Sequence, residues 1–374
     1  MRVGFTGFTA VVALAALGLA GCAAVPPLDP DAPAAVRLPV TLAGAAGVED
    51  GRARFRAHLC AVMARRGEAR TCGDVLRRLA DEPEDAGPPV DATTPLPPGL
   101  RVLFVQGFGA ACALPLVRSF ADVVADLRRR GVAADLVPVD GFAPIRTNAR
   151  EIVAAVRALP RSPDERLVLV GHSKGITDIL EALTLDGGLA ARTAAAVAVA
   201  GTVGGSPLAL HASDALPDFV AALPGTPCEA RGRTGLAELR PGARIAWLAR
   251  HELPKRVAYY SLVTLPSPER VSRGLWPTYR RLAWFDPRND GMMPAEDQII
   301  PGGELLGFVN ADHLAVAVPV AEAHPFLGAL LADRNRFPRE AVFEAVLRRV
   351  AERLPPPQGP VSHARASASR SRSK

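Results

Sequence analysis

One serine in this chain lies where the backbone could expose a nucleophile. The stretch LVLVGHSKGITDILEAL, residues 167–183, passes from an apolar run typical of a strand into a helical pattern, with GHSKG (171–175) at the junction. Glycines two residues to either side of Ser173 permit a tight strand-to-helix turn, which pushes the serine oxygen out above a sheet. The G-x-S-x-G pattern in this context predicts nucleophilic catalysis by Ser173; a glycine-rich turn with an incidental serine is the alternative.

The acid partner is expected in WFDPRNDGMMP, residues 284–294. A serine hydroxyl is a weak nucleophile unless a histidine, oriented by a carboxylate, takes its proton. When the nucleophile lies on such a turn, the acid follows one late strand and the histidine follows the next. This segment comes after a predicted strand at 256–265, and its Asn-Asp-Gly turn contains Asp290. We predict Asp290 as the acid, with Asp286 as its competitor and a plain turn as the alternative.

The histidine expected in this order is His313. It lies in ADHLAVAVP (311–319), directly after the predicted strand ELLGFVN (304–310). The other histidines lie in less suitable segments: His58, His172, His211, His251, His324 and His363. Among these, His172 adjoins Ser173, where local packing or hydrogen bonding is the more natural role. We therefore predict His313 as the general base.

Strands and helices alternate from residue 101 onward. The predicted strands are 101–106, 134–139, 167–171, 194–201, 256–265 and 304–310, and the predicted helices are 113–131, 148–159, 176–183 and 338–354. Such alternation predicts a mostly parallel sheet with helices on both faces. The interval between 201 and 256 is too long for one crossover helix, so a cap insertion is expected at about 206–255.

These segments together resemble the α/β-hydrolase superfamily, and within it bacterial triacylglycerol lipases and related serine esterases. The likeness covers about residues 101–333. NDGMMP (289–294) resembles the lipase acid turn N-D-G-x-x-P, GTVGGSPL (201–208) partly matches the lipase stretch T-P-H-R-G-S-P-L, and LRPGARIAWL (239–248) resembles the helix before the next strand. The resemblance implies an α/β-hydrolase fold and a serine carboxylic ester hydrolase that acts through an acyl-enzyme, with a small-molecule or lipid ester as substrate and no cofactor.

The resemblance also implies two backbone donors for the developing oxyanion. One is the N–H of Lys174, the residue after the nucleophile, whose side chain is expected to face solvent. QGFG (106–109) resembles an H-G-F-G-type oxyanion loop with Gln106 in place of the histidine, so Phe108 is the second predicted donor. A glycine turn at the end of a strand is the alternative for this loop. No metal site is predicted.

Two other functions remain open at this point. The same three residues could act on a thioester, an amide or a polyester, or could transfer an acyl group to an acceptor other than water. The segment 206–255 would decide among these substrates, but one sequence does not reveal its preference. The chain could also be a catalytically silent, hydrolase-like scaffold lipoprotein, although the presence of all three residues argues against that role.

The first 22 residues, MRVGFTGFTAVVALAALGLAGC, predict export. An early arginine, an apolar run and small residues before Cys22 are typical of a secretory signal. LAGC (19–22) resembles the bacterial lipobox, in which the cysteine becomes lipidated. Ala23 follows in place of the aspartate associated with inner-membrane retention, so we expect an anchor in the cell envelope, at the outer membrane. A cleaved signal with a chance cysteine is the alternative.

The remaining segments complete the expected organisation. We divide the chain into a lipoprotein signal peptide (1–22), a tether (23–47), a helical N-terminal appendage with a linker (48–100), the hydrolase domain (101–354) and a disordered basic tail (355–374). The net charge is +6, but four cations lie in 361–374 and a fifth is Arg2, which leaves the rest of the chain at +1. A nearly neutral body gives no electrostatic footprint for nucleic acid.

Four cysteines remain if Cys22 is lipidated. An even number in an oxidising compartment favours two disulfides, for which three pairings are possible. Cys60 and Cys72 are close in sequence and lie in consecutive helical segments, so we expect them to pair. Cys112 and Cys228 then pair by elimination.

Overall fold

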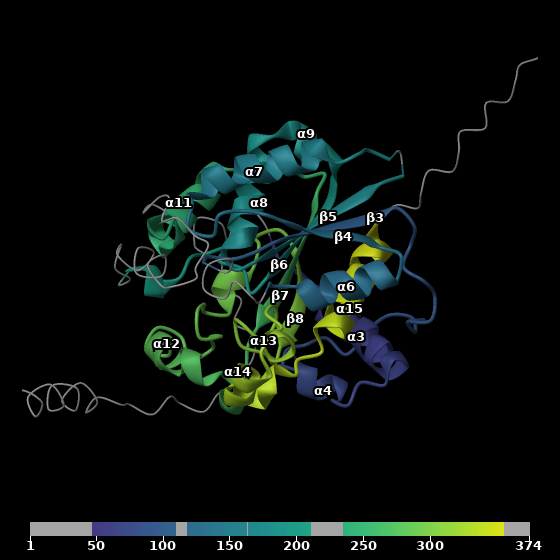
Figure 1. Ribbon diagram of the computed structural model, residues 1–374, viewed down its shortest axis with the longest axis vertical. Coiled ribbons are helices and arrows are strands. Elements are labelled where there is room, and N and C mark those ends of the chain that lie inside the picture. Colours follow the sequence, from purple (N-terminus) through teal and green to yellow (C-terminus); the bar gives the residue numbers. More distant parts are fainter. Residues whose placement is uncertain (1–46, 110–117, 163, 211–234, 355–374) are drawn as a thin grey trace, which may run out of the picture.

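A mostly parallel, eight-stranded sheet forms the centre of the computed structural model (Figure 1), which describes residues 47–109, 118–162, 164–210 and 235–354. The strand order is β1-β8-β7-β6-β5-β3-β4, and β2 pairs with β8 beside this path. The strands are β1 (Glu49–Asp50), β2 (Leu76–Arg77), β3 (Leu100–Val105), β4 (Ala133–Val137), β5 (Arg166–His172), β6 (Thr193–Val199), β7 (Ala258–Thr264) and β8 (Glu304–Val309). Only the β2–β8 pairing among them is antiparallel. The predicted α/β class is confirmed.

Helices cover both faces of this sheet. Figure 1 shows α7, α8, α9 and α11 on one side and α3, α6 and α15 on the other, and each group shares a buried apolar cluster with the strands. The helices are α3 (Arg52–Arg66), α4 (Cys72–Val75), α6 (Ala121–Arg129), α7 (Ile145–Ala158), α8 (Lys174–Leu185), α9 (Gly187–Arg192), α11 (Pro241–Arg250), α12 (Trp276–Leu282), α13 (Val320–Ala323), α14 (Pro325–Leu330) and α15 (Arg339–Arg353). Short 3₁₀ helices occupy Pro207–Leu210 (η1), Ala237–Leu239 (η2), Pro268–Arg270 (η3), Arg273–Leu275 (η4), Glu296–Gln298 (η5) and Ala332–Asn335 (η6).

The central strands are buried on both faces, which explains their nearly continuous apolar sequences. In β5, every residue from Leu167 to His172 is buried. Helix α6 begins at Ala121, after Phe120 in a left-handed conformation with φ 61°; residues 113–117 of the predicted helix lie outside the described residues. The Phe120 ring is itself fully buried and packs 4.8 Å from Phe104 and 5.3 Å from Phe343.

The segment predicted as a separate N-terminal appendage is part of the hydrolase core. β1 pairs in parallel with β8, and β2 pairs with β8 in antiparallel register. On α3, Phe55, Leu59 and Val62 are fully buried, and this helix packs against α15 (Figure 1). The expectation of an appendage at 48–100 is therefore corrected for residues 49–77. The physical reason is that β8 would otherwise be an exposed sheet edge beside an uncovered apolar surface.

The structure joins Cys60 of α3 to Cys72 of α4 in a disulfide, as predicted. The other three cysteines, Cys22, Cys112 and Cys228, lie outside the described residues. The same holds for the signal peptide, the tether up to residue 46, the tail and residues 211–234 of the predicted cap. Of the helices in the described part of the chain, none has the length and apolar character needed to cross a membrane.

The described parts of the predicted cap insertion are short. Residues 207–210 and 237–239 form η1 and η2, and α11 follows from Pro241, with proline at the helix start. Proline is favoured there because the first turn has no use for its missing N–H. α11 leads to β7, as the resemblance to lipases at 239–248 implies.

Candidate active site

Ser173 occupies a strained turn between β5 and α8. Its backbone has φ 53° and ψ −125°, a conformation that costs energy for any residue other than glycine. A Cβ atom at Gly171 would lie 2.4 Å from the nitrogen of Ile176, and one at Gly175 would lie 2.3 Å from the oxygen of Val105. Both glycines are therefore needed for the close approach of helix and strand, and the serine side chain is left partly exposed.

Asp290 and His313 lie at the edge of the sheet where Ser173 also lies, beyond the carboxyl ends of β7 and β8. The Nδ1 of His313 lies 2.8 Å from Oδ2 of Asp290, and both side chains are buried. The backbone N–H of His313 also donates to the oxygen of Asp290 at 3.1 Å. The competing acid, Asp286, instead accepts a hydrogen bond from the backbone N–H of Arg288 at 2.8 Å. The structure thus brings Asp290, and not Asp286, to the histidine.

The carboxylate of Asp290 is surrounded by donors that sequence reasoning did not identify in full. Backbone N–H groups of Met292 and Met293 donate to Oδ1 at 2.8 and 2.7 Å. The hydroxyl of Thr264, at the end of β7, lies 2.6 Å from Oδ2, and the side chain of Gln298 bonds to Thr264. These hydrogen bonds supply partners to both oxygens of a carboxylate that is excluded from water. The only signal for Thr264 in the sequence is its place at the end of the strand before the acid turn.

A second buried carboxylate shapes the loop that carries His313. Asp312 accepts hydrogen bonds from the backbone N–H groups of Ser272 (2.6 Å), Leu314 (3.0 Å) and Ala315 (2.8 Å). Burial raises the pKa of Asp312, and these hydrogen bonds oppose that rise. The loop conformation therefore depends on a residue that the sequence motif does not single out.

The loop predicted to supply an oxyanion donor lies directly against Ser173. A Cβ atom at Gly107 would come within 2.7 Å of the Cβ and 3.2 Å of the Oγ of Ser173. The Oε1 atom of Gln106 is buried and has no hydrogen-bond partner among the described residues. The half-buried ring of Phe108 packs edge-on to Phe142, with 5.0 Å between the ring centroids. A side chain larger than hydrogen at position 107 would therefore require the loop or the serine to shift.

The segment after β6 connects the serine to the acid turn. The N–H of Thr202 donates to the oxygen of Ser173 at 3.1 Å, and the two hydroxyl oxygens are 3.5 Å apart. Further along, the hydroxyl of Ser206 donates to the oxygen of Met292 at 2.7 Å. The stretch 201–208, which partly matches a lipase pattern, thus contacts both the turn at Ser173 and the turn that contains Asp290.

Comparison with known proteins identifies the family. No known family model matches the chain, and neither does any curated protein. Among solved structures, the metagenomic carboxyl esterase MGS0156 is 41% identical, covers 87% of this chain and 98% of its own, and superposes with a TM-score of 0.77. The chain belongs to the carboxyl esterases of the α/β-hydrolase superfamily.

Two other hydrolases of known structure are less similar to this chain. The lipase BlEst2 from Bacillus licheniformis, in its mature form, is 19% identical to this esterase, with 60% of this chain and 89% of that chain covered and a TM-score of 0.48. The RedJ thioesterase from Streptomyces coelicolor is 15% identical, with 72% and 98% covered and a TM-score of 0.38.

His172 of this esterase contacts the backbone and the ring of His313. Its Nε2–H donates to the backbone oxygen of His313 at 2.8 Å, and the two rings lie 4.9 Å apart. Burial, aided by the neighbouring ring of His313, lowers the pKa of His172 to about 3. The ring is therefore neutral near pH 7 and acts as a fixed hydrogen-bond donor.

Lys174 of the esterase differs from expectation. Its side chain is fully buried, with Nζ 2.7 and 2.9 Å from the two carboxylate oxygens of Asp178, one turn along α8. The expectation that this lysine faces solvent is therefore wrong. The reason is that the first turn of α8 lies inside the molecule, where an ammonium group is retained only with a partner.

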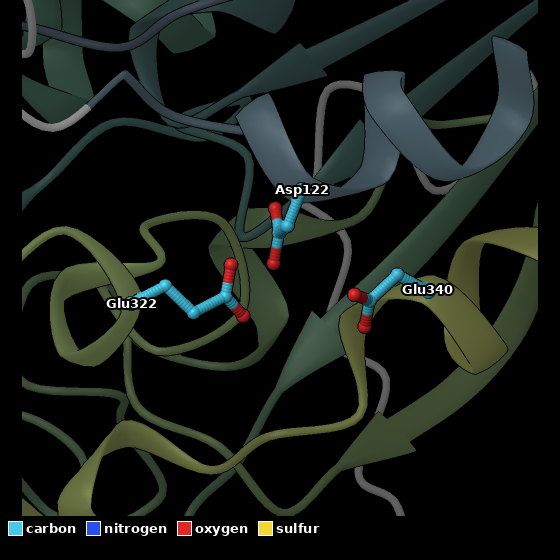
Figure 2. Close-up of side chains that lie close together, drawn as sticks. All are labelled: Asp122, Glu322 and Glu340. Atoms are coloured by element: carbon cyan, nitrogen blue, oxygen red, sulfur yellow. The ribbon is translucent and has the colours of Figure 1, made fainter. Parts of the chain in front are cut away.

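Three carboxylates elsewhere in the esterase lie close enough together to suggest a metal site. Figure 2 shows Asp122, Glu322 and Glu340, which each offer one carboxylate oxygen within 4.8 Å of the others. The guanidinium of buried Arg339 bonds to Asp122, and it lies 3.4 Å from Oε1 of Glu322. Because this guanidinium already supplies a cation, we assign no metal to the cluster.

Proposed function

We propose that the protein hydrolyses carboxylic esters through an acyl-enzyme, with Ser173 as nucleophile, His313 as general base and Asp290 as the acid that orients it. The observation that carries the proposal is the buried hydrogen bond between His313 and Asp290 at the sheet edge where Ser173 occupies its strained turn. The similarity to a carboxyl esterase over nearly the whole of that chain supports the same reaction.

The geometry of the histidine defines its part in the reaction. Since Nδ1 of His313 donates to Asp290, the proton-free nitrogen is Nε2, which can accept a proton. In the first step, Nε2 takes the proton of Ser173 as Oγ attacks the carbonyl carbon of the ester. Asp290 keeps the ring in this tautomer and stabilises the imidazolium that forms.

The tetrahedral intermediate then collapses to the acyl-enzyme. The backbone N–H groups of Phe108 and Lys174 are the proposed donors to its oxyanion. His313 returns the proton to the leaving alcohol as the ester C–O bond breaks. A water molecule repeats the attack on the acyl-enzyme, its proton passing to His313 and then to Ser173 Oγ, and the carboxylic acid leaves.

Apolar side chains beside the predicted oxyanion loop support a substrate with a hydrophobic acyl group. Phe108 packs against a buried cluster that consists of Ile145, Ala209, Leu236 and Leu239. These residues come from α7 and from the described ends of the predicted cap. We therefore propose a small-molecule or lipid ester as the substrate.

Fluorophosphonate labelling tests the nucleophile. We expect the wild-type protein and the surface control Ser162→Ala to be labelled, and Ser173→Ala to be unlabelled and inactive toward p-nitrophenyl esters from acetate to palmitate. Undiminished labelling of Ser173→Ala would show that another residue is the nucleophile. A folded wild-type protein that neither reacts with the probe nor hydrolyses any of these esters would contradict the proposed activity.

We also propose that Cys22 carries a lipid that anchors the esterase to the cell envelope, at the outer membrane. The support is the LAGC stretch after an apolar run. Growth with an alkyne-tagged fatty acid should label the wild-type protein and leave Cys22→Ser unlabelled. Equal labelling of both, or a mature N-terminus away from Cys22, would exclude this anchor.

A second disulfide, between Cys112 and Cys228, would link the region of the oxyanion loop to the cap. Non-reducing peptide mapping should recover these two cysteines in one cross-linked peptide. Recovery of either as a free thiol would exclude the bond.

A further inference from the structure

We propose that Asn148, with the buried pair Lys174–Asp178, positions the two backbone donors of the oxyanion hole relative to each other. Asn148 is a positioning residue in this proposal, since it acts through the backbone of other residues and not on the substrate. The inference rests on the proposed function, because it concerns the same site.

The first link is the ion pair inside α8. Lys174 and Asp178 are both fully buried, and the lysine bonds to both carboxylate oxygens. Burial raises the pKa of Asp178 to about 6, against the opposing effect of Lys174. The carboxylate is therefore ionised at pH 8. Because Lys174 also supplies a proposed oxyanion donor from its main chain, the pair secures the turn on which that donor lies.

The second link is Asn148 on α7, which joins α8 to the loop after β4. Its Nδ2 group donates to Oδ2 of Asp178 at 2.9 Å and to the backbone oxygen of Asp140 at 2.9 Å. Asn148 is fully buried. The side-chain amide of Asn148 thus connects α8, the helix that follows the proposed nucleophile, to the loop after β4.

The third link is the contact between that loop and the oxyanion loop. A Cβ atom at Gly141 would lie 2.5 Å from the nitrogen of Gly109 and 3.2 Å from the oxygen of Gly107, so the two backbones touch. Asp140 shapes the loop, because its Oδ1 accepts the N–H of Phe142 at 2.9 Å. Any shift of the loop at 140–142 would therefore move the backbone around Phe108.

The path closes at the nucleophile. Gly107 lies against Ser173 with no room for a Cβ atom. Starting from Lys174, the contacts run through Asp178, Asn148 and the loop at 140–142 to the loop at 107–109, and then back to the serine. Both proposed donors, the N–H groups of Phe108 and Lys174, lie on this closed path.

The chemical nature of the links favours a geometric role over a stabilising one. A buried ion pair contributes little net stability compared with apolar residues of similar size, because both charges lose their hydration. Its hydrogen bonds are directional, however, so they fix the distances between the groups that they join. Apolar packing allows such distances to vary. Oxyanion stabilisation needs such definition, since its donors must be preorganised around the developing charge.

The test uses Asn148→Ala, which leaves the Lys174–Asp178 pair intact and removes its link to Asp140. At pH 8, we expect kcat to fall by about tenfold or more, with KM changed by less than about threefold. Affinity for an alkyl boronic acid should fall by a similar factor. Its boron bonds to Oγ of Ser173 and becomes a tetrahedral anion, while the serine proton passes to His313, so this inhibitor depends on the same donors.

Glu304→Gln is the matched control. It perturbs another buried ion pair, in which Glu304 accepts from Arg349 at 2.7 and 2.9 Å, at the start of β8 and hence at the opposite end of the sheet from Ser173. This variant should lose thermal stability and keep its kcat and boronate affinity. Thr147→Ala, at an exposed neighbour of Asn148 on α7, should match the wild type in every measurement.

Two results would overturn the inference. One is a folded Asn148→Ala protein with wild-type kcat and boronate affinity; the other is a loss of kcat with no parallel loss of boronate affinity. If Asn148→Ala fails to fold, Asn148→Ser, whose hydroxyl reaches fewer partners, is held to the same two criteria. Absence of Ser173-dependent turnover in the wild type would instead contradict the proposed function itself.

Discussion

Asp290 is held by hydrogen bonds to both of its carboxylate oxygens, one of which is the bond to His313. Two backbone N–H groups bind Oδ1, and the hydroxyl of Thr264 shares Oδ2 with His313. A carboxylate fixed in this way can orient the imidazole, but it cannot rotate to take another partner. Asp286, in the same segment, is partly exposed and bonds to Arg288 instead.

The two aspartates provide a matched test. We expect Asp290→Asn to fold and to lose about a thousandfold or more in kcat, because an amide can donate to Nδ1 and so favours the wrong tautomer of His313. Asp286→Asn should stay within a few fold of the wild type. Steady-state kinetics on one p-nitrophenyl ester, with circular dichroism to verify folding, measures both. Equal losses in the two variants would disprove the assignment of the acid.

At the scale of elements, the loop at 106–109 packs so closely against the turn at Ser173 that no space remains for a Cβ atom at Gly107. We expect Gly107→Ala to reduce kcat/KM by about a hundredfold, because the new methyl group would displace either the nucleophile or the oxyanion loop. Gly187→Ala on α9, where a Cβ atom meets nothing within 4 Å, is the control and should retain full activity. Activity of Gly107→Ala near that of the control would show that the loop can move away at little cost.

The 3₁₀ helix η5 contains an acid whose charge opposes folding. Burial, together with the charges of Glu296 and Asp286, raises the pKa of Asp297 to about 7. The folded state therefore binds this proton more tightly than the unfolded chain does. The stabilising effect of protonated Asp297 is fully present below about pH 4, and it is lost as the pH rises through about 7.

We expect Asp297→Asn to be more stable than the wild type by at least about 1 kcal/mol at pH 8.5 and to show little gain at pH 4. Urea unfolding at a series of pH values measures the difference, which should grow between pH 4 and 7. Glu84→Gln, at an exposed position, should give no such trend. A gain for Asp297→Asn that is the same at every pH would mean that burial of the charge is not its cause.

At the scale of the whole molecule, the N-terminal segment completes the sheet and one of the two cores. β1 and β2 both pair with β8, and α3 buries its apolar face against α15. Ion pairs also cross this junction, among them those of buried Glu344 with Arg65 and Arg66. This segment and the hydrolase body are therefore expected to unfold together.

Leu59→Ala tests this expectation. The fully buried side chain lies on α3, and its truncation should lower the free energy of unfolding by about 2–4 kcal/mol, in a single transition that coincides with loss of activity. Ala64→Ser, at an exposed position of the same helix, should change that free energy by less than about 0.5 kcal/mol. A separate early transition that leaves activity intact would indicate an independent appendage after all.

The sequence by itself determined the features that depend on neighbours along the chain. Ser173 was predicted as the nucleophile because strand, glycine turn and helix follow one another within seventeen residues. Asp290 and His313 were predicted as its partners because, in a parallel sheet, loops after successive strands emerge at one edge, and the structure joins these two side chains by a hydrogen bond. Cys60 and Cys72 form the expected disulfide, which was predicted because they are only twelve residues apart in the sequence.

Only the tertiary structure decided the contacts between distant segments. It distinguished Asp290 from Asp286, placed Thr264 beside the acid and buried Lys174 against Asp178. It also inserted the N-terminal segment beside β8. These outcomes depend on strand register and on how helices pack, and those follow from the burial of the whole apolar surface rather than from any local pattern. Apolar periodicity reveals which face of an element is buried; it does not reveal what covers that face.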